Sequence, residues 1–207
     1  ANTDWIDQAY NTALMQTYHI SVSGGSDRAT YMLSSEYFDQ EGIMAGTSSR
    51  RFNLRSNINV KLNDKISVGV NLFGYKKRID EPINAASGTD NEGLNYELRR
   101  NTMPTVPAYY SSGDFGFFDG AYDVHGMSSK NILFDSSIGE HYTDLNRQEG
   151  KIYLDYDIIE GLHFATSFAF IANSIANSNF KPTSQRYDAE GNLVSENTLN
   201  SLLNANT

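Results

Sequence analysis

The chain has 207 residues, a net charge of −9, a hydrophobic fraction of 39% and no cysteine. Disulfide bonds and cysteine-based metal sites or catalysis are thereby excluded, and no apolar run approaches the roughly 18 residues that a transmembrane helix needs. The negative charge, with no basic cluster larger than Lys76-Lys77-Arg78, argues against nucleic acid as a partner.

The first two expected strands form a hairpin. The composition includes 13 tyrosines and 11 phenylalanines and is rich in Ser, Asn and Gly, which favours strands and turns over helices. A first strand is expected at 17–23, with an apolar face of Tyr18, Ile20 and Val22. Gly24-Gly25-Ser26-Asp27 follows as a tight turn of the kind that hairpins use. A second strand is expected at 30–38, with an apolar face of Tyr31, Leu33 and Tyr37.

The third expected strand, 51–62, has the clearest alternation in the chain. Its apolar face is interrupted only by Ser56 and comprises Phe52, Leu54, Ile58, Val60 and Leu62. Its other face is polar throughout and comprises Arg51, Asn53, Arg55, Asn57, Asn59 and Lys61. Because successive side chains of a strand point to opposite faces, the segment separates an apolar medium from water. It is long enough to cross a hydrocarbon layer at a tilt, although a surface strand of a soluble β-sandwich is an alternative.

Three more strands complete the pattern. The tight turn Asn63-Asp64-Lys65 leads into a strand at 66–75, which is followed by a long connection, 76–145, without alternation. The alternation returns at 150–158, and the tight turn Glu160-Gly161 leads to a last strand at 162–172. A polar stretch, 173–207, ends the chain.

The connections between these strands are short and long in turn. All tight turns then fall at one end of an antiparallel sheet and all long connections at the other, as in outer-membrane barrels. A soluble sandwich has no reason to sort its connections in this way, and long structureless loops are uncommon in compact domains. The pattern predicts an all-β fold, an antiparallel up-and-down meander forming part of a large transmembrane β-barrel. Four tyrosines lie near strand ends: Tyr18, Tyr31, Tyr37 and Tyr156. They are either part of the aromatic girdle at the membrane interface or ordinary strand-forming residues.

Seven short motifs follow one another in a characteristic order along most of the chain. They are Asn2-Thr3-Asp4-Trp5-Ile6-Asp7, His19-Ile20-Ser21-Val22-Ser23-Gly24-Gly25, Tyr37-Phe38-Asp39-Gln40-Glu41-Gly42-Ile43, Arg51-Phe52-Asn53-Leu54-Arg55-Ser56-Asn57, Pro104-Thr105-Val106-Pro107-Ala108-Tyr109-Tyr110, Gly150-Lys151-Ile152-Tyr153-Leu154-Asp155-Tyr156 and Gly161-Leu162-His163-Phe164. Together they resemble the barrel region of SusC/RagA-type TonB-dependent transporters of Bacteroidetes. The resemblance implies a place in the outer membrane of a Gram-negative cell, in contact with its lipid.

The same resemblance implies parts that lie outside this sequence. Members of the family carry an N-terminal extension, a Ton box that engages the TonB complex, and a plug domain, all of which precede the matched region. Their barrels have roughly 22 strands, so six strands are about a quarter of the wall. The complete transporters work with a SusD-like surface lipoprotein and import an oligosaccharide or peptide substrate. Since the chain opens on Ala1, we expect a piece of a longer protein.

The residues give little support for an enzyme, a cofactor or a metal site. The histidines, His19, His125, His141 and His163, are far apart and lack metal-ligand spacing. Asp155 and Asp157 share one face of a strand, but charges facing a water-filled lumen are the commoner cause of such a pair. An adhesin or a carbohydrate-binding sandwich is therefore the main alternative to a transporter.

The long connection carries the candidate contact residues. Between Met103 and Phe118 it contains Tyr109, Tyr110, Phe115, Phe117 and Phe118 among Ser, Gly and Asp. Exposed aromatic rings stack on sugars or anchor a protein partner. Alternatively, these rings pack the loop against the barrel rim. A calcium site is a weaker hypothesis, because it rests only on the loop acids Asp80, Asp90, Asp114, Asp119 and Asp123.

Overall fold

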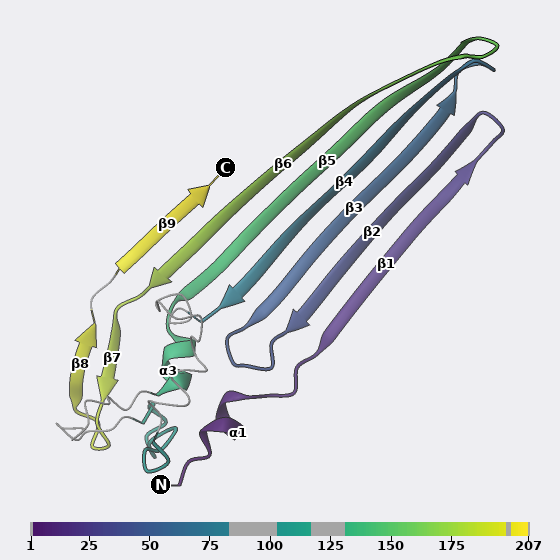
Figure 1. The fold of residues 1–207 in the computed structure, drawn as a ribbon. Helices are drawn as coiled ribbons and strands as arrows, with labels where there is room; N and C mark the ends of the chain where they lie inside the picture. Colours follow the sequence, from purple (N-terminus) through teal and green to yellow (C-terminus); the bar gives the residue numbers. More distant parts are fainter. Residues whose placement is uncertain (1, 83–102, 117–130, 198–199, 207) are drawn as a thin grey trace.

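The computed structural model describes residues 2–82, 103–116, 131–197 and 200–206. Most of these residues belong to one antiparallel sheet of seven strands in the order β1-β2-β3-β4-β5-β6-β9 (Figure 1). Its strands are β1 (Met15–Gly25), β2 (Ala29–Glu41), β3 (Ser48–Lys61), β4 (Ile66–Glu81), β5 (Glu140–Ile159), β6 (Leu162–Lys181) and β9 (Asn200–Asn206). The first six follow the chain as a meander, which confirms the predicted fold class.

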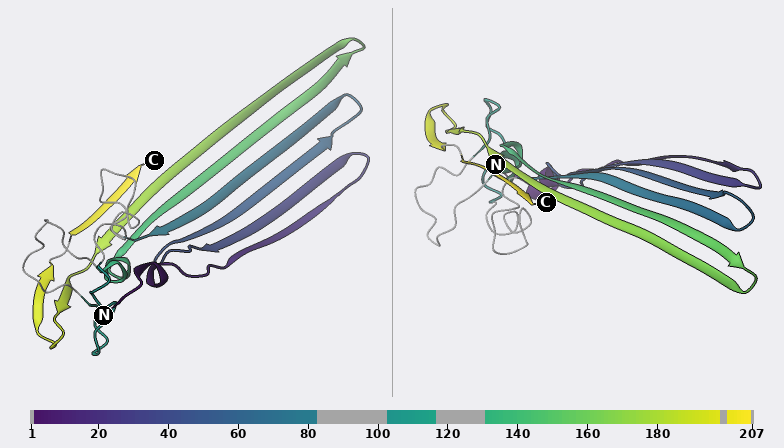
Figure 2. Two further views of the ribbon diagram at one scale, coloured as in Figure 1. Left: turned by 60° about the horizontal axis from the view of Figure 1, so that its bottom comes forward. Right: turned by 90° about the horizontal axis from the view of Figure 1, so that it is seen from above.

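The sheet is a single layer. Seen from above, no second sheet faces it among the described residues, which contradicts a sandwich (Figure 2). The small hairpin of β7 (Ser184–Tyr187) and β8 (Leu193–Asn197) forms a separate sheet beside the lower end of β6. The chain exposes 13909 Å², whereas a compact monomer of 23.1 kDa exposes roughly 9,700 Å². The strands therefore do not enclose a core of their own.

The three tight turns lie at one end of the sheet, as predicted, and all other connections lie at the opposite end (Figure 1). Asn63 closes the β3–β4 turn, because its side-chain Oδ1 accepts the amides of Lys65 at 2.8 Å and Ile66 at 2.9 Å. Gly161 in the β5–β6 turn has φ +82°, a conformation that favours glycine. We call this end of the sheet the turn end and the other the loop end.

The first turn differs from the prediction. Gly24 and Gly25 belong to β1, where they pair with Tyr31 and Thr30, and the turn itself is made by 26–28. Both glycines have close cross-strand neighbours: a Cβ on Gly24 would lie 2.6 Å from the Tyr31 hydroxyl. Gly24 is explained by the Tyr31 ring packed over the strand, and Gly25 by the close approach of the Ala29 carbonyl and Thr30.

The strands are longer than their apolar patterns. β4 continues past residue 75 to Glu81, and β5 begins at Glu140 rather than near 150. The predicted connection 76–145 was therefore too long, since six of its residues at each end, 76–81 and 140–145, belong to β4 and β5. β6 likewise extends through the polar segment that follows residue 172, to Lys181. In these extensions both faces are mostly polar, with isolated apolar residues such as Ile79, Leu145 and Ile175, so the backbone ladder continues where the alternation of hydrophobicity has ended.

Gly150 is expected to be the more sensitive of two glycines on one face of the sheet. The Phe170 ring on β6 packs over Gly150 on β5, in the space that a Cβ would fill. Gly150→Ala should displace this ring and lower barrel stability by about 1–3 kcal/mol. Gly74→Ala on β4 is the matched control, because its Cβ would meet only the Arg147 carbonyl at 3.4 Å. Heat-induced unfolding of the full-length protein, followed by gel mobility, measures both; equal effects would contradict the packing.

Candidate functional site

The sheet has two faces of different chemistry. The outer face is the face that carries Phe52, the residues paired with Phe52 on the neighbouring strands, and every second residue along each strand from these. Near the turn end, this face carries the apolar side chains. They form the apolar band, which comprises Tyr18, Ile20, Val22, Tyr31, Leu33, Tyr37, Phe52, Leu54, Ile58, Val60, Leu62, Ile66, Val68, Val70, Leu72, Ile152, Leu154, Tyr156, Leu162, Phe164, Phe168 and Phe170. These side chains stay uncovered: Ile20 is 68% exposed and Phe168 is 67% exposed.

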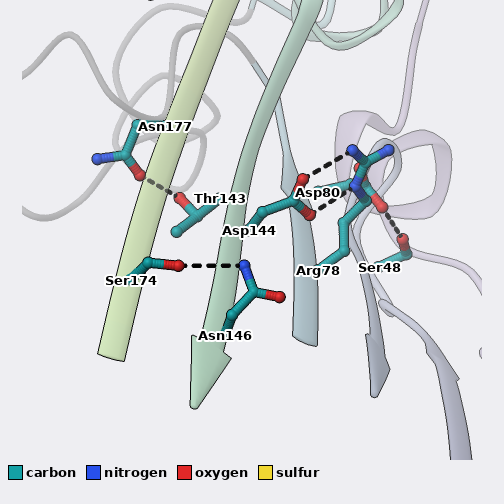
Figure 3. Close-up of polar contacts among 8 residues, drawn as sticks. All are labelled: Ser48, Arg78, Asp80, Thr143, Asp144, Asn146, Ser174 and Asn177. Carbon is teal, nitrogen blue, oxygen red and sulfur yellow. Dashed lines mark hydrogen bonds and ion pairs between the residues drawn. The ribbon is translucent and has the colours of Figure 1, made fainter. Parts of the chain in front are cut away.

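The outer face changes abruptly toward the loop end. Beyond Phe52 and its neighbours lies the polar collar, which comprises Asp39, Ser48, Arg50, Lys76, Arg78, Asp80, Tyr142, Asp144, Asn146 and Ser174. Its members bond directly across the strands (Figure 3). The Arg78 guanidinium donates to both Asp144 carboxylate oxygens at 2.9 and 3.0 Å and lies 3.9 Å from the Tyr142 ring centroid.

Two further pairs extend the collar to either side of this ion pair. The Ser48 hydroxyl donates to Asp80 at 2.7 Å, and the Asn146 amide donates to Ser174 at 3.3 Å (Figure 3). A charged side chain in hydrocarbon costs about 2–4 kcal/mol near the bilayer midplane, so a ladder of this kind belongs in water or among lipid headgroups. The collar therefore marks the height at which an apolar medium around the sheet must end.

The inner face is mostly polar, with scattered apolar side chains such as Phe73, Leu145 and Ile171. Glu36 accepts hydrogen bonds from Arg51 at 3.1 Å and from the Asn53 amide at 2.8 Å, and Thr143 donates to Asn177 at 2.8 Å. Arg147 and Glu149 form an ion pair along one strand. These contacts are half-exposed, as expected of a face that looks into water or onto another polar surface.

A shallow hollow lies in the middle of the inner face. Its volume is about 430 Å³, and its lining includes Arg55, Asn71, Phe73, Glu149 and Lys151. The Arg55 guanidinium lies over the Phe73 ring, 5.2 Å from its centroid. The hollow offers cations, amides and the aromatic rings of Phe73 and Phe170, a mixed lining that suits peptide groups and provides no nucleophile next to a base.

The histidine on the inner face at the turn end, His163, has two acidic neighbours. His163 Nδ1 lies 2.8 Å from Asp157, and its Nε2 lies 3.6 Å from Asp155. The two aspartates thus share one histidine partner. In the described part of the chain, no three His, Asp or Glu side chains are grouped so as to hold a metal ion.

The loop end holds the only hydrophobic cluster that is buried among the described residues. It joins the short helices α1 (Trp5–Ala9) and α3 (Ile132–Ser137) to Val106, and we call it the loop-end core: Trp5, Ala9, Val106, Ile132, Leu133 and Phe134. Trp5 is 5% exposed, and its indole donates to the Met103 carbonyl at 2.8 Å. Thr3 is tied to the same loop through its amide, which donates to Pro104 at 2.8 Å.

Asn131 holds the loop-end core together. Its Nδ2 donates to the carbonyls of Ala108 at 2.8 Å and Gly116 at 2.9 Å. Its Oδ1 accepts the amides of Leu133 and Phe134, which caps the first turn of α3. One buried amide thus satisfies four backbone groups from two segments of the long connection.

Asn131→Ala should open this part of the loop end without unfolding the barrel. Removing the side chain takes away the cap and the Asn131 donor from two carbonyls, of which the Ala108 carbonyl keeps the Gly116 amide, at a local cost of about 2–4 kcal/mol. Hydrogen exchange and limited proteolysis of the full-length protein should then detect faster opening of 103–116. Asn192→Ala, in the exposed turn after β7, is the control, and equal protection in both variants would contradict this role.

The structure describes three of the five aromatic residues proposed as contacts. Phe115 faces inward: its ring packs edge-on against Phe134 with centroids 5.5 Å apart, and it also packs on Tyr109 at 5.1 Å. Tyr109 keeps an outer side, at 49% exposure, in a small hairpin that bridges it to Phe115. Tyr110 is half-buried in the same hairpin. Phe117 and Phe118 lie outside the described residues.

The two loop acids that the structure describes, Asp80 and Asp114, have different partners. Asp80 bonds to Ser48 in the collar, whereas Asp114 accepts a hydrogen bond from Ser112 at 2.9 Å at the tip of the small hairpin. Asp90, Asp119 and Asp123 lie outside the described residues. Asp188, in the β7–β8 turn, accepts hydrogen bonds from Asn192, and these hold its carboxyl pKa below the usual range.

The comparisons with known proteins agree with this geometry. TonB-dependent receptor P3 of Formosa agariphila is 30% identical over 189 residues, which cover 88% of this chain and 18% of the receptor. TonB-dependent receptor SusC of Bacteroides thetaiotaomicron is 40% identical over 58 residues, or 28% of this chain and 6% of the receptor. The solved RagAB peptide transporter superimposes with a TM-score of 0.66 at 22% identity, covering 87% of this chain and 20% of that one. No protein-family model matches the chain.

The chain belongs to the SusC/RagA-type TonB-dependent transporters. This confirms the family and the outer-membrane setting that the motifs indicated. The chain spans about a fifth of the length of these relatives, 18% of the P3 receptor and 20% of the RagAB chain. None of the described helices is long and apolar enough to cross a membrane.

Two features of this SusC/RagA-type wall escaped sequence reasoning. The polar collar was placed in the connections between strands, because the strand segments that carry it are mostly polar on both faces and give no hydrophobic period. The loop-end core was missed because its helices have five and six residues, too short for a helical pattern. The Asp4 cap before Trp5 and the Asn131 cap before Ile132 are the only local signals for them.

Proposed function

We propose that this chain forms part of the wall of an outer-membrane, TonB-dependent nutrient importer that takes up glycans or peptides. The complete importer would work with a SusD-like surface lipoprotein and draw energy from the TonB complex. SusC and RagAB support this proposal by their likeness, and the RagAB relative is a peptide transporter. Among the described residues we find no arrangement of catalytic groups. We therefore propose that this part of the wall encloses the path of the substrate rather than reacting with it.

The uncovered apolar band is the observation that carries the proposal. From Phe52 to Leu62 it runs about 33 Å along β3, or about 25 Å in height at a strand tilt of about 40°. That is about the height of the apolar belt of outer-membrane barrels. The polar inner face then looks into the lumen, and the loop end faces the outside of the cell.

Tyr109 is the candidate contact that the geometry favours at the outer mouth. Its ring is half-exposed on a hairpin that Phe115 anchors to the loop-end core, so it is presented on a fixed support. A rigid, outward aromatic ring suits stacking on a sugar or packing against a peptide or a lipoprotein. Phe115 acts through this support rather than by touching a ligand.

Growth of a deletion strain complemented with the full-length gene tests the function. Uptake of labelled oligosaccharides and peptides should be restored by the wild type and abolished when TonB is removed. Tyr109→Ala should weaken substrate or lipoprotein binding by roughly tenfold, while Tyr109→Phe keeps most of it. Unimpaired growth of the deletion strain on every glycan and peptide source would overturn the proposal.

A further inference from the structure

Three cationic side chains, Arg50, Lys76 and Arg78, lie together on the outer face, at the edge of the polar collar that borders the apolar band. Lys76 on β4 is paired in register with Phe52 on β3, and Arg78 is paired with Arg50 in the next outward-facing row. Phe52 closes the row of rings that begins with Tyr18 and Tyr37 on the neighbouring strands. The cations therefore begin directly where the apolar band ends.

Two of these cations are still able to bind an anion. Arg78 is held by both oxygens of Asp144, but Arg50 reaches only Asp39, at 3.6 Å, while its side chain remains 56% exposed. Lys76 is exposed and has no hydrogen bond or ion pair in the described part of the chain, although it lies within electrostatic range of Asp144. On the opposite face of the same strands, Arg51 is already bound to Glu36.

We propose that Arg50 and Lys76, with Arg78 fixed between them by Asp144, bind the phosphate of an outer-leaflet lipid. The inference rests on the proposed place of the sheet in the outer membrane, with its loop end outward. A lipid whose chains cover the apolar band carries its phosphate at the height of the collar. Guanidinium and ammonium groups are the natural partners of phosphate, and their attraction is strong beside hydrocarbon, where little water screens it.

Geometry favours a lipid over a free anion. The three cations lie on an open face above an uncovered apolar surface rather than in a pocket that would enclose a small ion. A phosphate attached to acyl chains is held there by both the cations and the band, whereas inorganic phosphate would be held by the cations alone. Affinity should therefore depend on the chains and on the phosphate together.

Binding of diphosphoryl lipid A to the full-length protein, purified in a neutral detergent and stripped of lipid, tests this proposal. The double variant R50Q/K76Q should bind it about tenfold more weakly than wild type. The control K61Q/K77Q removes the same charge from the inner face of β3 and from the position next to Lys76, and should bind normally. Wild-type protein should bind dephosphorylated lipid A weakly, and inorganic phosphate at equal phosphorus concentration should not compete.

Equal lipid A binding by R50Q/K76Q and wild type would overturn the proposal, as would equal binding of the dephosphorylated lipid or competition by inorganic phosphate. The last two measurements need no variant, so they decide even if a substitution impairs folding. R50Q/K76Q should retain nutrient uptake, because neither residue faces the lumen. If the wild-type protein took up no nutrient, the proposed importer function would be refuted. If it took up nutrient but bound lipid A and dephosphorylated lipid A equally, only the lipid site would be refuted.

Discussion

Ile58→Arg in the full-length transporter is expected to destabilise the folded barrel by about 2–4 kcal/mol. Ile58 lies on the outer face of β3 between Tyr31 and Val70, in the middle of the apolar band, and 42% of it is exposed with no protein over it. An arginine there would place a charge near the centre of the hydrocarbon. Heat-induced unfolding and the yield of assembled protein in outer membranes both measure the effect.

Ser48→Arg is the matched control for this substitution. It introduces the same side chain on the same strand and the same face, but in the polar collar opposite Asp80. An arginine at this height meets water, headgroups and a carboxylate, so the variant should be nearly as stable as wild type. Asn57→Ala, on the inner face, should also be close to silent. If Ile58→Arg and Ser48→Arg were equally stable, the outer face would not be lipid-facing.

The isolated 207-residue chain is expected to associate rather than remain a soluble monomer. β1 has an unpaired edge along its whole length in the described structure, and β6 is paired with β9 only from Ile175 to Lys181. The turn-side half of β6 thus presents a row of free backbone donors and acceptors. The apolar band adds a continuous exposed surface larger than soluble monomers tolerate.

Size-exclusion chromatography with light scattering in detergent-free buffer measures this directly. Oligomers or aggregates are expected, and detergent should shift the distribution toward smaller species by covering the apolar band. A stable, monodisperse species of 23.1 kDa without detergent would contradict both the open edges and the lipid-facing surface. A soluble binding module would then be the better account of the fold.

The strand centres could be predicted because the two sides of this sheet face different media. Wherever lipid lies on one side, alternate residues must be apolar, and Phe52, Leu54, Ile58 and Val60 follow that rule without help from tertiary structure. The same reasoning placed the tight turns at Asn63-Asp64 and Glu160-Gly161. It failed at Gly24-Gly25, where small residues accommodate the Tyr31 ring inside the strand.

The strand ends could not be predicted, for a physical reason. Beyond the apolar band, toward the loop end, both sides of the sheet face a polar medium, so Lys76, Arg78 and Asp144 carry no period that distinguishes a strand from a loop. These residues are held in register by the strand pairing that begins near the turn end, together with cross-strand bonds such as Arg78–Asp144. The collar exists because the sheet is already formed beneath it.

The sequence by itself determined the class of fold, the two-faced strands and the family, because these depend on local alternation and on contiguous motifs. Only the tertiary structure decided where the band stops, and which aromatic residues of the long connection are buried. Trp5 and Phe115 meet in one cluster although more than a hundred residues separate them. Contacts over such separations depend on how the sheet brings its loop end together, and no local pattern encodes that arrangement.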